Sequence, residues 1–433
     1  MIAIDTALTE RLVSRGPIQV GLIGAGFSGR NIAHQVVTST PGIRLAAICN
    51  RTLEKARTAY KASGVQDIVT VDAPSALDHA VASGRYAVTS DPSVVYCAQA
   101  IEAIVESTGT VDFAAEVVLG AIKHRKHVIL VNVELDATLG PYLKTLADVA
   151  KIVYTNTGGD EPGAAMDMIR FVRTIGIEPV VAGNLKGLYD PYRNPATQKV
   201  FAERANQDPA RIASFADGTK LSLELCVLAN GSRFTVAKRG MYGPELSDVN
   251  ESAAYFRDKV RSPDGIVDFL VGAAPGSGIF VLGYTDDPYK AEYLKCFKMG
   301  DGPLYPFYRP FHLPQFEVVV TIARAVLFHD ATVTPAGPPI CDAVTIAKRD
   351  LSAGEVLDGF GGFTSYSLLD RYSAARASGA LPIGLSTGRR LTREVRKDDL
   401  VTFDDVEPSE DSVSERLRGA QDRYFGALTG REG

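Results

Sequence analysis

The 433-residue sequence lacks several features that would each assign a chain to a particular class of protein. No apolar run approaches the roughly 20 residues that a membrane-spanning helix needs, so no membrane partner is expected. Basic residues are scattered and the net charge is −5, so no surface for nucleic acid is predicted. The six histidines form no H-x-x-x-H pair, which disfavours a zinc site.

Cysteine is also scarce, and its pattern excludes a disulfide framework. The five cysteines are odd in number, widely spaced and without a Cys-x-x-Cys motif. Each has apolar neighbours, as reduced and buried thiols do. We therefore expect a cytoplasmic protein in which these residues fill the core: Cys49, Cys97, Cys226, Cys296 and Cys341.

The length of the chain predicts two or three domains. In the first part, short apolar runs alternate with helical stretches, which indicates βαβ units and a doubly wound Rossmann sheet. We interpret 52–100, with two helix-like stretches, as an insertion in this sheet. The predicted strands are Ile18–Ile23, Arg44–Cys49, Ala103–Glu106, His127–Val131 and Lys151–Tyr154.

Beyond the first 160 residues the pattern changes, and the expected fold class is α/β with three parts. A Rossmann domain spans 1–160, a central α+β domain for substrate binding and dimerisation spans 161–335, and a small, mostly β module with a charged tail spans 336–433. Three helices are predicted at the two ends and at the start of the central part: 1–17, 165–175 and 412–428. Residues 220–230 fit a strand or a helix, and further strands are expected within 344–357, 381–385 and 395–406.

The segment QVGLIGAGFSGRNIAHQVV predicts a dinucleotide site. An apolar strand leads into a G-x-G-x-x-G motif formed by Gly24, Gly26 and Gly29, and an apolar-periodic helix follows. The glycines permit a tight turn, a close approach to pyrophosphate and close helix–strand packing. Phe27 and Ser28 belong to the same turn, at the helix N-terminus that faces the anion. The alternative is a glycine-rich turn without a ligand.

The end of the second strand predicts which nucleotide is preferred. It reads Asn50-Arg51-Thr52, without the acid that usually accepts from the ribose hydroxyls of NAD. A guanidinium can instead pair with a 2′-phosphate, so we expect NADPH as cofactor, unless Arg51 is an ordinary solvated arginine.

Polar residues follow the next two strands, where a doubly wound sheet binds its ligand. Ser107, Thr108 and Gly109 follow one strand, and Asn132 with Glu134 follows the next. We predict that the first four help to bind the cofactor and that Glu134 takes part in catalysis, although each can equally be a loop cap.

A second glycine-rich loop, TNTGGDEPG, carries Asp160 and Glu161 before a helix. Two interpretations are open: one acid caps the helix, or the pair handles protons between the nucleotide and substrate domains. Two adjacent acids do not make a metal site, so no metal ligand is assigned.

These motifs resemble a known family. GLIGAG, ESTG, HVILVNVELD, TNTGGDEPG and KMGDGPLYPFYRPFHL are similar to homoserine-dehydrogenase-like oxidoreductases with a C-terminal SAF domain. That family includes the 1-deoxy-D-xylulose 5-phosphate reductoisomerase-like enzymes of isoprenoid biosynthesis. KRDLSAGEVL and LPIGL resemble the SAF module, so the similarity covers nearly the whole chain.

The resemblance implies reduction of a small, oxygen-rich carbonyl compound by NADPH in a homodimer or a higher homo-oligomer. Homoserine dehydrogenases carry a lysine after the strand that precedes Asn132 here, and this departure counts against homoserine chemistry. Lys186 is the candidate replacement for polarising the carbonyl, if it is not a surface lysine. The need for a divalent metal is open.

An anionic substrate also needs cations to hold it. Lys298, Arg309 and His312 lie within or beside one loop rich in tyrosine and proline, and they are the predicted substrate-binding residues. Three functions remain possible: reduction with rearrangement of a deoxypentulose phosphate, simple reduction of a semialdehyde or sugar, and NADP sensing without chemistry.

Overall fold

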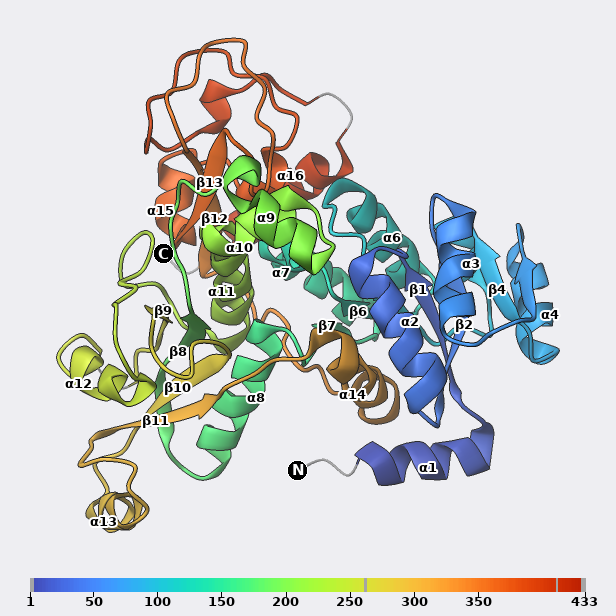
Figure 1. Ribbon diagram of the computed structural model, residues 1–433, viewed down its shortest axis with the longest axis horizontal. Helices are drawn as coiled ribbons and strands as arrows, with labels where there is room; N and C mark the ends of the chain where they lie inside the picture. Colours follow the sequence, from blue (N-terminus) through green and yellow to red (C-terminus); the bar gives the residue numbers. More distant parts are fainter. Residues whose placement is uncertain (1–3, 261–262, 410–411, 430–433) are drawn as a thin grey trace. The chain divides into compact units, whose positions relative to one another are not determined.

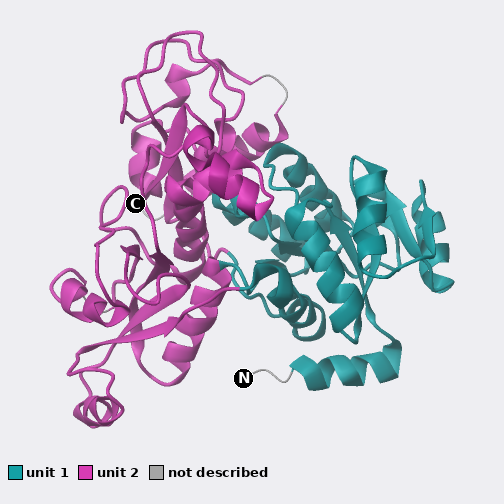
Figure 2. Cartoon of the chain, viewed as in Figure 1, with its two compact units in different colours: residues 1–160, 313–334 teal, residues 161–312, 335–433 magenta. Residues whose placement is uncertain are grey.

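The chain forms two compact units, which we describe one at a time. The computed structural model describes residues 4–260, 263–409 and 412–429 (Figure 1). Unit 1 comprises residues 1–160 and 313–334, and unit 2 comprises residues 161–312 and 335–433 (Figure 2). The division after residue 160 coincides with the boundary drawn from sequence. Segment 313–334, however, returns to unit 1, and the C-terminal part groups with the central part.

Unit 1 is built on a parallel seven-stranded sheet in the order β3-β4-β2-β1-β5-β6-β7. All the residues of β1 and β2 except one in each strand are fully buried, which explains why these strands read as continuous apolar runs. The strand order reverses beside β1, as in a doubly wound sheet, so the predicted Rossmann fold is confirmed. The strands are β1 (Ile18–Ile23), β2 (Ile43–Cys49), β3 (Ile68–Thr70), β4 (Tyr86–Thr89), β5 (Ala103–Glu106), β6 (His127–Leu130) and β7 (Tyr154–Asn156).

Helices complete unit 1, and one of them comes from much later in the chain. Val318 and Ile322 on α14 are fully buried against the core formed by β1, α2 and β2. The predicted N-terminal helix is observed as α1, apart from residues 1–3, which lie outside the described residues. The helices are α1 (Ile4–Arg15), α2 (Phe27–Ser39), α3 (Leu53–Ala62), α4 (Pro74–Ala82), α5 (Pro92–Cys97), α6 (Asp112–Lys123), α7 (Val133–Ala150) and α14 (Pro314–Phe328).

Two sequence-based predictions for unit 1 are wrong. The presumed insertion 52–100 contains the two expected helices, but β3 and β4 also lie in it and extend the sheet. These strands have only three and four residues, too few for a recognisable apolar period. The fifth predicted strand begins at Tyr154 rather than Lys151, because Lys151 ends α7 in the left-handed conformation (φ +58°).

The main sheet of unit 2 has the order β11-β10-β8-β9. β8 (Glu178–Lys186) pairs antiparallel with β10 (Ile279–Tyr284) and parallel with β9 (Ile266–Val271), and β11 (Leu304–Arg309) pairs antiparallel with β10. Two helices pack on this sheet, α8 (Glu161–Thr174) and α11 (Thr219–Ser232). α11 resolves the ambiguity at 220–230: its residues are buried nearly all round, and an apolar stretch buried on every side shows no helical stripe.

The C-terminal part of unit 2 contains fewer strands than predicted. β12 (Cys341–Ala347) pairs with β13 (Ser365–Arg371), which the sequence reading missed. The strands expected within 381–385 and 395–406 are wrong: these segments form isolated bridges and 3-10 turns at Ile383–Leu385 and Phe403–Asp405. Their apolar residues nevertheless fill a common core, which explains the strand-like pattern.

The remaining helices of unit 2 lie in its connections and at its C-terminus. The predicted tail helix is observed as α16. The segments are α9 (Pro195–Ala205), α10 (Pro209–Ala216), the 3-10 turn Val249–Glu251, α12 (Ser252–Phe256), α13 (Pro288–Cys296), α15 (Tyr372–Ala377) and α16 (Val413–Thr429). Among the described residues, no helix combines the length and apolarity needed to cross a membrane.

Candidate active site

The glycine motif lies where β1 passes into α2, and its three glycines meet three different requirements. Gly24 has a φ of +102° and forms the turn. A Cβ on Gly29 would lie 2.1 Å from the carbonyl oxygen of Gly24, so only glycine permits this packing of helix on strand. A Cβ on Gly26 would meet nothing within 4 Å, so the backbone is open to an approaching group here. This geometry fits the predicted pyrophosphate site.

Other residues predicted to bind the cofactor brace this turn. Asn50 accepts a hydrogen bond from the Ala25 amide (3.0 Å) and donates to the Thr52 carbonyl (2.8 Å), so its side chain braces the turn. Ser107 donates to the carbonyls of Ile23 and Gly24. Arg51 is exposed, which leaves it available to a 2′-phosphate.

Ser28 offers an independent sign of a ligand at this turn. Phe27 and Ser28 are the first two residues of α2. The Ser28 hydroxyl is buried, and the described residues provide it with no hydrogen-bond partner. Buried hydroxyls usually have a partner, and a helix N-terminus favours anions. The residues present therefore fit a dinucleotide phosphate.

Glu106 is the last residue of β5 and directly precedes Ser107, Thr108 and Gly109, the residues predicted to bind the cofactor. It is fully buried, and it accepts hydrogen bonds from the Thr108 amide (2.8 Å) and the Asn132 side chain (2.8 Å). Burial raises its pKa to about 7, although these hydrogen bonds act to lower it. Asn132 in turn caps α7 by accepting from the Leu135 amide. Through these bonds Glu106 links the loop after β5 to the loop after β6. Gly109, in the first of these loops, has a φ of +69°.

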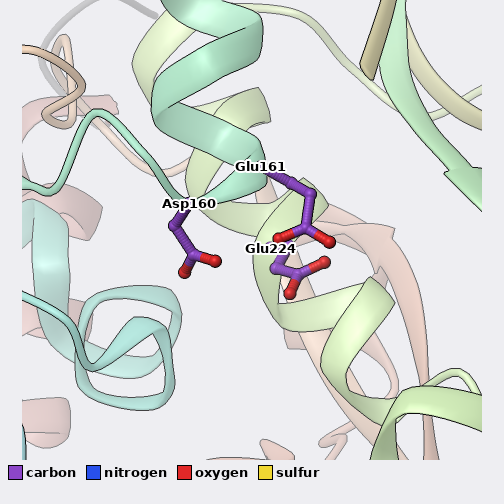
Figure 3. Close-up of side chains that lie close together, drawn as sticks. All are labelled: Asp160, Glu161 and Glu224. Atoms are coloured by element: carbon purple, nitrogen blue, oxygen red, sulfur yellow. The ribbon is translucent and has the colours of Figure 1, made fainter. Parts of the chain in front are cut away.

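In unit 2, the end of β8 brings a lysine to two carboxylates. The Nζ atom of Lys186 lies 3.4 Å from Oε1 of Glu161 and 3.5 Å from Oε2 of Glu224. Glu161 is the first residue of α8, and Glu224 lies in α11, so three elements of the unit meet here. The two glutamate side chains lie close together in Figure 3. Their side chains are 9% and 2% exposed, and that of Lys186 is 14% exposed.

This arrangement sets the protonation state of Lys186. Burial acts to lower the pKa of Lys186, whereas the carboxylates of Glu224 and Glu161 act to raise it. The net pKa lies above the ordinary lysine value, because an opposite charge at this range favours the ammonium form. Lys186 is therefore a cation at neutral pH, suited to donate a proton rather than to accept one.

Asn184 and Glu224 belong to this site and were missed from sequence. Asn184, two residues before Lys186 and on the same face of β8, is fully buried and donates a hydrogen bond to Oε2 of Glu224 (2.8 Å). The side-chain oxygen Oδ1 of Asn184 has no hydrogen-bond partner among the described residues. The available signal was the single acid in the apolar run LSLELCVL, since a buried carboxylate needs a partner.

The predicted substrate cations divide between the two ends of β11. Nε2 of His312 lies 3.4 Å from Oε1 of Glu161. Ile279 on β10 pairs with Arg309 on one side and with Asn184 on the other, so Arg309 and Asn184 lie at the same level of the sheet. Lys298 lies six residues before the opposite end of β11, which begins at Leu304, and it is exposed. β11 therefore lies between Lys298 and the other two predicted cations, and the role of Lys298 in substrate binding stays a prediction.

The remaining catalytic candidates, Asp160 and Glu134, are carboxylates in different parts of the chain. Asp160 is buried and directly precedes Glu161, as Figure 3 shows. Glu134 lies in the first turn of α7, in unit 1. Asp160, Glu161 and Glu224 each have a carboxylate oxygen suited to a hard cation, but the ammonium of Lys186 already lies against two of these carboxylates.

Comparison with known proteins assigns a class of function to part of the chain. Residues 159–318 match the family described as "Oxidoreductase DRL, catalytic domain". The matched segment includes Glu161, Asn184, Lys186, Glu224 and His312. The expectation of an oxidoreductase is confirmed at this level, and the match specifies no substrate. No curated protein sequence matches the chain.

Solved structures with a similar fold are dehydrogenases at low sequence identity. A homoserine dehydrogenase from Thiobacillus denitrificans is 16% identical, with a TM-score of 0.46, covering 78% of this chain and 83% of its own. A myo-inositol 2-dehydrogenase from Lactobacillus plantarum is 14% identical (TM-score 0.36; 62% and 74% covered). A myo-inositol dehydrogenase from Corynebacterium glutamicum is 12% identical (TM-score 0.39; 68% and 75% covered).

Proposed function

We propose that the protein is an NADPH-dependent oxidoreductase that reduces a small, polyhydroxylated and phosphorylated carbonyl compound. The observation that carries the proposal is the protonated Lys186 held by Glu161 and Glu224 inside the segment that matches an oxidoreductase catalytic domain. Unit 1 adds the glycine turn, with room at Gly26 and a buried hydroxyl at Ser28 for a phosphate.

This proposal assigns nucleotide binding to unit 1 and proton transfer to Lys186 in unit 2. Bound NADPH supplies the hydride for the carbonyl carbon. Lys186 donates a hydrogen bond and then a proton to the carbonyl oxygen, on which negative charge develops. Glu161 and Glu224 keep Lys186 protonated before the reaction. His312, next to Glu161, is placed to help return the proton afterwards.

The most specific substrate we propose is 1-deoxy-D-xylulose 5-phosphate, reduced with rearrangement of its carbon skeleton. This choice rests on the family resemblance and on Arg309 and His312 near the Lys186 end of the sheet, where they can hold a phosphate. Simple reduction of a semialdehyde or a sugar is the second candidate, since one fold of this class can host several reductases.

The test is NADPH oxidation with 1-deoxy-D-xylulose 5-phosphate, and with aspartate semialdehyde in parallel. Consumption of NADPH with the pentulose phosphate, together with a rearranged polyol phosphate in the NMR spectrum, is the expected result. Lys186→Met should lower turnover by about 10²–10⁴-fold and leave NADPH binding unchanged. Turnover of the semialdehyde alone would favour the second candidate. Tight NADPH binding without turnover of either compound would favour a sensor.

A further inference from the structure

The C-terminal part of unit 2 contacts the chain on both sides of the Lys186 site. After Lys186 the chain continues through residues 187–194 to α9, and Glu224 lies on α11, which begins at Thr219. Residues of the segment 335–409 bond to the chain just before α9 and to the residues that start α11. Each tie joins residues within unit 2.

The first tie is the ammonium of Lys348. It donates to the Arg193 carbonyl (2.7 Å), the Gly362 carbonyl (2.8 Å) and the Asp217 carboxylate (2.8 Å). The Lys348 side chain is 4% exposed and that of Asp217 is fully buried. All three N–H donors of this buried cation are therefore satisfied, each by a different segment of unit 2.

The same ion pair fixes the start of α11. The second carboxylate oxygen of Asp217 accepts from the Thr219 amide (2.8 Å), so Asp217 satisfies an amide at the helix N-terminus while it pairs with Lys348. Glu224 lies five residues further along this helix. A displacement of the helix start therefore displaces the carboxylate that faces Lys186.

A second tie holds the segment 187–194 from its outer side. The Tyr192 hydroxyl donates to the Asp398 carboxylate (2.9 Å), which also accepts from Tyr366 on β13 (3.1 Å). The ammonium of Lys397 lies 3.7 Å from the centre of the Tyr192 ring. Tyr192 is 42% exposed, so this tie is weaker than the buried one.

We propose that the C-terminal segment positions the catalytic pair, and that Lys348 is the positioning residue that keeps Glu224 against Lys186. The proposal rests on the proposed function for the role of Lys186. It gives the segment a function inside unit 2: it fixes the chain just before α9 and the start of α11 relative to each other.

The test compares Lys348→Met with two controls. Lys348→Arg keeps a cation that can still reach Asp217 and should recover part of the loss. Arg389→Met removes another buried cation, one that pairs with Glu415 on α16 and contacts neither Asp217 nor Arg193 in the hydrogen bonds given above. If Lys348→Met does not fold, Lys348→Met with Asp217→Asn removes both charges and takes its place.

Two readouts separate positioning from loss of folding. The first is labelling of Lys186 by an amine-reactive acylating reagent across pH, followed by peptide mass spectrometry; it needs no substrate. Glu161 and Glu224 hold Lys186 protonated. Displacement of Glu224 should therefore lower, by one pH unit or more, the pH at which labelling of Lys186 is half-maximal. The second is turnover of the pentulose phosphate, expected to fall 10-fold or more in kcat with NADPH affinity unchanged.

Each combination of results has one meaning. A shifted midpoint in Lys348→Met but not in Arg389→Met supports the proposal, and it does so even if no substrate is turned over, in which case only the proposed function fails. An unshifted midpoint in folded Lys348→Met, or an equal shift in Arg389→Met, overturns it.

Discussion

Lys186 and its neighbours show how single residues acquire a role from distant parts of the chain. Lys186 and Asn184 alternate on one strand, but Glu161 and Glu224 reach them from two helices. The glycine turn of unit 1 is the opposite case, since its requirements lie within six consecutive residues. Local motifs were therefore predicted from sequence, whereas Glu224 was not: its approach to Lys186 depends on how α11 packs on β8.

Glu106 is the residue whose ionisation should be visible in the stability of unit 1. Its pKa is raised by burial to about 7, above the ordinary value of 4.5, so the folded state holds its proton more tightly than the unfolded state does. This contribution is full below about pH 4.5 and is lost as the pH rises through 7. Asp136, also near 7, acts in the same direction.

We predict that Glu106→Gln flattens this pH dependence. The wild-type protein should lose roughly 3 kcal/mol through Glu106 between pH 4.5 and 8, and the variant should keep only the part due to Asp136. Urea unfolding at several pH values measures the difference. Equal slopes for the two proteins would show that Glu106 ionises normally.

Arg51 is predicted to select the phosphorylated nucleotide. Arg51→Ala should weaken NADPH binding by about 10- to 100-fold, because a charged hydrogen-bonded pair is lost, and should leave NADH binding nearly unchanged. Fluorescence titration with both nucleotides measures this. An equal loss for both, or none for either, would contradict a 2′-phosphate contact.

Among the elements, the β1–α2 turn separates a folding requirement from a binding requirement. Gly29→Ala should destabilise unit 1, because the new Cβ meets the Gly24 carbonyl at 2.1 Å. Gly26→Ala should leave the melting temperature nearly unchanged, since its Cβ meets nothing within 4 Å, but should weaken NADPH binding. Thermal melts with and without NADPH test both variants. Normal NADPH affinity in Gly26→Ala would place the phosphate elsewhere.

The elements also show why part of the fold was not predictable. Residues 300–314 read as one loop because tyrosine and proline obscure the alternation of β11, and this hid the separation of Lys298 from Arg309. In the C-terminal part, Leu381 and Val401 are buried in apolar runs, but the residues beside them pair only through isolated bridges, such as Ala380 with Thr402. A periodic apolar pattern indicates which residues are buried. Whether such a segment forms a strand depends on its hydrogen bonding to a partner that is distant in sequence.

At the scale of the whole molecule, both units are discontinuous in sequence. α14 follows residues 161–312 of unit 2 in the chain but packs into unit 1. In the same unit, the Thr155 hydroxyl donates to the Val333 carbonyl (3.0 Å). The boundary drawn at residue 335 from composition missed this return, because α14 has an apolar face like any other helix. Unit 1 is therefore complete only when residues 313–334 are present.

This arrangement predicts a long-range effect on nucleotide binding. Ile322→Ala should destabilise unit 1 by about 2–5 kcal/mol, because a fully buried side chain is truncated. Excess NADPH should recover part of this loss. Val320→Ala, on the exposed side of the same helix, is the matched control and should change stability by less than about 0.5 kcal/mol. Equal effects of the two variants on the melting temperature would contradict the packing of α14.

The pH–rate profile of Glu224→Gln tests the central claim most directly. The variant removes the negative charge of Glu224 beside Lys186. The glutamine keeps a side-chain oxygen that can accept the hydrogen bond from Asn184. We predict that the wild-type enzyme keeps its kcat well into the alkaline range, because the carboxylates of Glu224 and Glu161 raise the pKa of Lys186 above its ordinary value. In Glu224→Gln the loss of activity should begin at least one pH unit lower. An unchanged profile would show that Lys186 is not the group that donates the proton.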